Sequence, residues 1–219
     1  MADPRSRLSP ASLEELDALF RLLDISEGVF SLSVAECASP SLIRDIVGHL
    51  NDPRPGQLLV RIDESTSDVL ADVERQTTGI TPLAVHVAGF ERRGGRSEPG
   101  SLDERMSGLL RRLNAGREHW KSILACPVIL WMPPYAARRL PDVARDFASW
   151  VSHGFVFEEA GASALSGATL ASAAQGSDLD TQDWYPSLNL PPLEKQERIA
   201  ELERRIALAR DRDEHRAIV

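Results

Sequence analysis

The feature that most constrains the fold is the unbroken apolar run at residues 126–132 (CPVILWM), which two prolines follow. A strand that is apolar on both faces needs cover above and below it, as a central strand of a parallel sheet has. Further strand-like segments occupy residues 29–36, 57–63, 81–90 and 154–159. Because helical patterns separate them, we expect right-handed β-α-β crossovers and a mainly parallel five-stranded sheet in a three-layer α/β/α domain.

The helices are predicted from their caps and from apolar spacing. Ser12 and Glu15 have the spacing of a capping box, which predicts a helix start at Ser12. Ser39 and Pro40 fit the N-cap and the first position of the helix that follows the first strand. Apolar residues at spacings of three and four predict the remaining helices at 65–76, 102–123 and 135–150.

The chain divides into three segments by composition. Residues 1–159 form the predicted α/β domain, and residues 160–192 form a linker rich in small residues whose aromatic and proline part, 183–192, docks back onto the domain. Residues 193–219 are predicted to form an amphipathic helix. Its apolar stripe has heptad spacing and consists of Ile199, Leu202, Ile206 and Ala209. Such a stripe needs a partner, which we expect to be another protein or a second copy of this chain.

Charge and composition narrow the partners and the compartment. The 219 residues carry a formal net charge of −8, which argues against nucleic acid as the main partner. Residues 1–9 lack the apolar core of a signal peptide, and no apolar stretch is long enough for a membrane span. We therefore expect a cytoplasmic protein without membrane contacts, in which Cys37 and Cys126 are buried, reduced thiols.

A parallel α/β sheet invites the test for a nucleotide site, which lies at the turn after the first strand. A working phosphate loop needs glycines and a lysine there, but residues 36–41 read ECASPS. The acidic pair of a hydrolase is also missing after the strand at 81–90, where Glu91 stands alone. We therefore expect a P-loop NTPase-like sheet without hydrolytic residues, no cofactor, no metal and no enzymatic activity.

Two other functions stay open at this stage. The first is nucleotide binding at an unorthodox anion site, formed by the start of the helix after Ser39 together with Arg44 or Arg117. The second is an enzyme that depends on Cys37, because a position just before a helix can lower the pKa of a thiol. The sequence contains no G-x-S-x-G elbow and no metal-binding histidine spacing.

Three stretches resemble a known family. They read LNAGREHW at 113–120, PVILWMP at 127–133, and DFASW at 146–150 followed by GFVF at 154–157. In order and spacing they are similar to the L-N-x-x-R, L-W-L-P and D-F-W-S-W then G-V-F-E-F pattern of degenerate, inactive STAND proteins (signal-transduction ATPases with numerous domains). Met132 and Ala148 depart from that pattern. The residues that carry the resemblance are Leu113, Asn114, Arg117, Trp131, Pro133, Asp146, Phe147, Trp150 and Phe157.

The resemblance implies a regulatory module that acts without nucleotide and associates with an effector in a bacterial defence or signalling system. The residues themselves suggest structural roles. We expect Trp131 to fill the crevice where a nucleotide would lie, with Phe147 and Trp150 packed under it, because large aromatic side chains are mostly core anchors. Asn114 and Arg117 are expected to cap or clamp a neighbouring backbone.

Overall fold

The computed structural model describes residues 3–63, 65–90 and 101–160, with the backbone alone for 101–103. Its strands are β1 (Ser31–Cys37), β2 (Gln57–Arg61), β3 (Ala84–Ala88), β4 (Pro127–Met132) and β5 (Val151–Phe157). Its helices are the 3-10 turn η1 (Pro4–Ser6), α1 (Pro10–Ile25), α2 (Pro40–Asn51), α3 (Val69–Thr77), α4 (Ser101–Ala115), α5 (Arg117–Ile123), α6 (Pro134–Val143) and α7 (Arg145–Ala148).

The predicted α/β class is confirmed, because all five strands pair in parallel in the order β2-β3-β4-β1-β5. The apolar run forms β4 at the centre of the sheet, where all six of its residues are buried. The crossover from β1 to β2 runs toward one edge of the sheet, whereas the three later crossovers run toward the other. Since parallel crossovers are right-handed, α2 must lie on the opposite face from the helices of those three crossovers.

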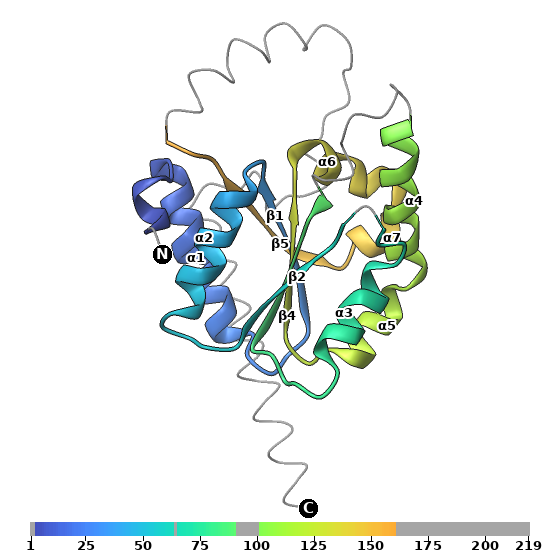
Figure 1. Ribbon diagram of the computed structural model, residues 1–219, viewed down its shortest axis with the longest axis horizontal. Coiled ribbons are helices and arrows are strands. Elements are labelled where there is room, and N and C mark those ends of the chain that lie inside the picture. Colours follow the sequence, from blue (N-terminus) through green and yellow to red (C-terminus); the bar gives the residue numbers. More distant parts are fainter. Residues whose placement is uncertain (1–2, 64, 91–100, 161–219) are drawn as a thin grey trace, which may run out of the picture.

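Helices cover both faces of the sheet (Figure 1). One core lies under α1 and α2, and it includes Leu16, Leu42 and Ile46. The other core lies under α3 to α7, and it includes Met106 and Leu140. Side chains of β1 to β4 enter the two cores alternately, as the two-residue period of a strand requires.

The capping box predicted at Ser12 and Glu15 is wrong, because α1 begins three residues earlier. Ser9 is the N-cap, its hydroxyl accepts the backbone N–H of Ser12 at 3.2 Å, and Pro10 takes the first helical position. Ser12 turns inward instead, where its hydroxyl accepts the backbone N–H of Glu158 at 2.8 Å. The hydroxyl of Ser12 therefore joins α1 to the end of β5.

Other helix bounds also differ from the sequence expectations. The helix expected from residue 65 begins at Val69, because the carboxylate of Asp68 accepts the N–H groups of Leu70 and Ala71. The helix expected over 102–123 is divided at Gly116 into α4 and α5, and the pattern over 135–150 contains the two helices α6 and α7. The prediction for Ser39 and Pro40 at the start of α2 is confirmed.

The domain described here ends with a bridge beyond β5, at Leu8 and Glu159. The predicted linker beyond residue 160 and the predicted helix at 193–219, with Ile199, Leu202, Ile206 and Ala209, lie outside the described residues. In the parts of the chain that are described, none of the helices combines the length and the apolar character that a membrane span requires.

Candidate functional site

The carboxyl end of β1 is the place where an open parallel sheet of this topology would bind a ligand. β1 lies between β4 and β5, and it continues into α2 on one face, whereas β4 continues into α6 on the other. A crevice opens where neighbouring strands send their connections to opposite faces, and ligands of α/β proteins bind there. The candidate site is therefore the turn from Glu36 to Ser41 and the residues around it.

The N-terminus of α2 already holds a carboxylate of the protein itself. The hydroxyl of Ser39 accepts the backbone N–H of Leu42 at 3.4 Å, as an N-cap should, and donates to Oε1 of Glu159 at 3.0 Å. The positive end of a helix favours an anion, because its first N–H groups lack partners within the helix. Glu159 supplies a negative charge at the place where a phosphate loop would hold a phosphate.

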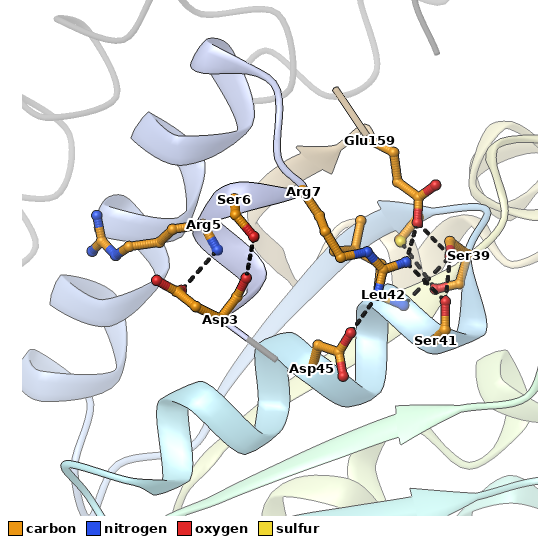
Figure 2. A network of polar contacts seen from close by, with 10 residues as sticks. Asp3, Arg5, Ser6, Arg7, Ser39, Ser41, Leu42, Asp45 and Glu159 are labelled. Atoms are coloured by element: carbon orange, nitrogen blue, oxygen red, sulfur yellow. Dashed lines mark hydrogen bonds and ion pairs between the residues drawn. The ribbon is translucent and has the colours of Figure 1, made fainter. Parts of the chain in front are cut away.

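Arg7 completes this network from the N-terminal segment (Figure 2). Its guanidinium group contacts the carboxylates of Asp45 and Glu159, and its Nη2 donates to Oγ of Ser41 at 3.0 Å. The hydrogen bond with Glu159 raises the pKa of Arg7, although partial burial opposes the rise. One guanidinium thus joins the segment before α1, the first turns of α2 and the residue after β5.

A short antiparallel bridge holds the two ends of this network in place. Leu8 pairs with Glu159, and the backbone N–H of Ser9 donates to the carbonyl of Glu158 at 3.0 Å. The backbone N–H of Ala160 in turn donates to the carbonyl of Arg7 at 2.6 Å. Leu8 is buried, so the bridge is anchored in the core under α1 and α2. The N-terminal segment therefore stays beside the end of β5.

Glu36 is a second acid at the same end of β1, on the opposite face of the sheet. It shares a face with Val34, which packs in the core under α6. Burial raises the pKa of Glu36, and the charge of Arg138 in α6 opposes this rise. Acidic side chains thus lie at the end of β1 on both faces of the sheet, Glu159 in contact with Arg7 on one face and Glu36 near Arg138 on the other.

The structure places Cys37 and Cys126 in the core rather than in an accessible site. Cys37 is 3% exposed, and its thiol donates to the carbonyl of Ser39 at 3.5 Å. Cys126 is 4% exposed, and burial raises the pKa of its thiol to about 11. A nucleophilic cysteine is normally an accessible thiolate in an electropositive place, and neither thiol has that setting.

Of the two arginines considered for an anion site with Ser39, the structure places Arg44 near Ser39 and Arg117 in the other layer. Ser39 and Arg44 lie on the first turns of α2, and Arg44 is exposed there. Arg117 begins α5, in the layer on the other face of the sheet. Its guanidinium lies 3.6 Å from the carboxylate of Glu118 and 3.7 Å from that of Asp146.

Several motif residues make internal contacts instead of forming a ligand site. Oδ1 of Asn114 accepts the backbone N–H of Phe147 at 2.9 Å, and Nη1 of Arg117 donates to the carbonyl of Asn114 at 3.4 Å. The ring of Phe147 packs against Trp120 with centroids 6.0 Å apart. Asn114 thus clamps a neighbouring backbone and joins α4 to α7. Leu113 is buried in the core on this face, and the carbonyl of Pro133 accepts the first N–H groups of α6.

Trp131 belongs to a buried polar chain that crosses three strands. Its indole N–H donates to Nδ1 of His86 at 3.1 Å, and Nε2 of His86 lies 3.0 Å from Oε1 of Gln57. An indole nitrogen is only a donor, so Nδ1 must accept and Nε2 must carry the proton. Complete burial lowers the pKa of His86 to about 3.

The expectation that Phe147 and Trp150 pack under Trp131 is wrong. Trp131 faces α1 and α2 and packs against Phe157, with ring centroids 5.3 Å apart. Phe147 and Trp150 pack with the core on the opposite face, where Trp150 makes an edge-to-face contact with Phe30. The alternation of β4 explains the difference, because Trp131 and its neighbours Leu130 and Met132 must face opposite layers.

Three residues of this region were not singled out from the sequence: Arg7, Glu159 and Arg61. Arg7 and Glu159 are separated by 152 positions, and no motif or periodicity links them. Arg61 has a signal that could have been used. Arg61 ends β2, on the face that α2 covers. The preceding residues of the strand predict an apolar side chain at this position, so the charge could have marked it as a polar site.

Across residues 3–63, 65–90 and 101–160, His, Cys, Asp and Glu nowhere gather in a group of three or more that could hold a metal ion. Comparison of the chain with protein-family models, with curated proteins and with solved structures finds no significant match.

Proposed function

We propose that this chain is a non-catalytic regulatory and protein-interaction module, related to the inactive STAND-type domains that its motifs resemble. The observation that carries the proposal is the internal occupant of the α2 N-terminus. There the carboxylate of Glu159 accepts from Ser39 and contacts Arg7, so the position of a bound phosphate is filled by the protein itself.

Electrostatics supports this interpretation. A phosphate at the β1 turn would meet the charges of Glu159 and Asp45, and among the described residues Arg7 is the cation in contact with both carboxylates. A phosphate loop relies on backbone N–H groups that glycines expose and on a lysine, and the turn at residues 36–41 has neither residue type. The turn therefore favours a closed structural junction over a site for triphosphate binding.

The contacts of the motif residues support the same conclusion. Asn114, Arg117 and Phe147 hold α4, α5 and α7 together. Trp131 uses its indole N–H within the core. Residues that make such contacts stabilise the fold. Their structural roles fit a module for regulation or assembly.

Calorimetry of the full chain with ATP and GTP, with and without Mg²⁺, tests the non-catalytic part of the proposal. We expect no magnesium-dependent binding and no turnover. Micromolar, magnesium-dependent binding that weakens in Ser39→Ala would contradict the proposal and favour the alternative of an unorthodox nucleotide site. The same titrations are made with Glu159→Gln, which removes the negative charge of the internal carboxylate but introduces neither a lysine nor a glycine.

The interaction part rests on the apolar stripe of residues 193–219, which the sequence analysis predicts. Leu202→Asp in the full chain places a charge in the middle of that stripe. We expect a smaller mass by light scattering, or weaker binding to the product of a neighbouring gene, with an unchanged circular dichroism spectrum. Glu201→Asp, on the predicted outer face, is the control. If mass and binding are the same for both variants and the wild type, the interaction proposal is wrong.

A further inference from the structure

A hollow lies beside the β1 turn, at the carboxyl ends of β2 and β3, and Pro40 of that turn contributes to its lining. Its volume is about 140 Å³. It is lined by residues of α2 and of the ends of β2 and β3 with the residue that follows each strand: Pro40, Ile43, Arg44, Leu59, Arg61, Ile62, Ala88 and Gly89. Most of the described lining residues have apolar side chains, and the charged residues among them are Arg44 and Arg61.

The fold brings these two arginines together from different elements. Arg61 is the last residue of β2 and shares with Leu59 the face that α2 covers. Arg44 lies on α2, one turn after Pro40, and Pro40 lines the same pocket. The edge strand and the helix thus present one guanidinium each to the same hollow.

Neither arginine is neutralised by the described part of the protein. Arg44 and Arg61 make no hydrogen bond or ion pair with another described residue. Arg54 provides a contrast, because its guanidinium contacts the carboxylates of Asp24 and Glu27. In a chain with a net charge of −8, two guanidinium groups at one pocket, neither with a partner among the described residues, are a local concentration of positive charge.

The floor of the pocket is a fixed piece of backbone. Gly89 has a φ of +118°, and a Cβ at this position would lie 2.0 Å from the carbonyl oxygen of Ile62. The N–H of Ile62 donates to the carbonyl of Ala88 at 2.8 Å, which continues the pairing of β2 with β3. Only glycine allows this close approach, so the pocket has a preformed floor.

We propose that this pocket binds the oxyanion group of a small organic molecule, a phosphate monoester or a carboxylate, between the guanidinium groups of Arg44 and Arg61. Guanidinium groups bind both kinds of oxyanion through paired hydrogen bonds. The volume suits one anionic group with a short apolar body, since pockets for larger ligands span about 300–1,000 Å³. The proposal does not depend on the regulatory function proposed above.

Nuclear magnetic resonance of the full chain labelled with nitrogen-15 tests the pocket directly, with inorganic phosphate and phenyl phosphate as probes. We expect saturable shifts of the Nε–Hε signals of Arg44 and Arg61 with both probes. Phenyl phosphate should bind several-fold more tightly, because its ring contacts the apolar wall. Equal affinities for the two probes would contradict the contact with an apolar body and, with it, the proposal of an organic ligand.

The double variant Arg44→Gln/Arg61→Gln should weaken binding at least tenfold, and each single variant should weaken it less. Arg21→Gln is the matched control, because Arg21 is another exposed arginine and lies on α1, outside the pocket. Its affinity should stay within twofold of the wild type. Shifts that do not saturate, or an equal loss in Arg21→Gln, would overturn the proposal. Either result would leave the magnesium-nucleotide test of the β1 turn unaffected.

Discussion

The hydroxyl of Ser39 donates a hydrogen bond to Oε1 of Glu159 at 3.0 Å and thereby joins the N-cap of α2 to a residue 120 positions later in the chain. Together with the contacts of Arg7, this bond ties the turn after β1 to the segment before α1 and to the residues after β5. The first strand, the last strand and the N-terminal segment thus meet at one point, and the stability of the domain should depend on it.

Replacement of Arg7 by Gln is expected to lower the midpoint of thermal unfolding. The change removes the cation that contacts both Asp45 and Glu159, so the two carboxylates lose the positive charge that offsets their repulsion. The loss should diminish at high salt, since these side chains are partly exposed and salt screens their repulsion. Thermal unfolding followed by circular dichroism at low and high salt measures both effects.

The double variant Arg7→Gln/Glu159→Gln provides the control for this interpretation. It removes the repulsion as well as the attraction, so it should be more stable than the sum of the two single changes predicts. Additive effects of the two substitutions would show that the pair makes no energetic contribution. The Arg5→Gln variant, which breaks an exposed ion pair with Asp17, should change the midpoint little.

Replacement of Asn114 by Ala should destabilise the domain by about 1–3 kcal/mol, because the backbone N–H of Phe147 loses its acceptor. Asn114→Asp keeps an acceptor oxygen at the same place and should be less destabilising. Urea unfolding of both variants measures the difference. Equal losses in the two variants would contradict a role for the hydrogen bond and point to packing alone.

The layers of this fold could be predicted from sequence, but its long-range contacts could not. The apolar run at β4 and the regular alternation of strands and helices determine a parallel sheet covered on both faces, and Ser39-Pro40 marks the start of α2. The clamp by Asn114 was also foreseeable, since an Asn near a helix end commonly bonds to backbone.

The errors have local physical causes. Ser12 has the sequence pattern of an N-cap, but Ser9 followed by Pro10 forms the N-cap instead. The hydroxyl of Ser12 contacts the backbone after β5. Trp131 was placed with the wrong aromatic partners because the sequence does not say which face of β4 each side chain takes. The contact between Arg7 and Glu159 depends on the strand order. Because β5 lies next to β1, the residues after β5 and the segment before α1 both reach the start of α2.

The thiols are expected to react slowly in the folded protein. Cys37 and Cys126 are both buried, and the raised pKa of Cys126 keeps its thiol protonated at neutral pH. In the Cys126→Ser variant, Ellman's reagent reports on Cys37 alone, and its rate should rise by orders of magnitude in urea. Rapid labelling of Cys37 without denaturant would contradict the buried position and revive the hypothesis of a cysteine-dependent enzyme.

The last prediction concerns His86, whose neutral form the core requires. Its pKa is lowered to about 3 in the folded protein, against an ordinary value of 6.5, so the unfolded chain binds a proton that the folded chain does not. The contribution of His86 to stability should therefore level off about one pH unit above its ordinary pKa and fall as the pH decreases toward 5, with a slope of up to about 1.4 kcal/mol per pH unit. Urea unfolding between pH 5 and 7.5 measures this slope before most carboxylates titrate.

Two variants separate His86 from the other histidines. His86→Gln can still accept from the indole of Trp131, and it should be less stable at neutral pH but lose much of the slope, because no proton can bind at that position. His119→Gln, at an exposed position near Glu74, should keep the slope of the wild type. If the slope persists in His86→Gln and disappears in His119→Gln, the proton uptake belongs to the surface and the buried chain from Gln57 to Trp131 is not the acid-sensitive element.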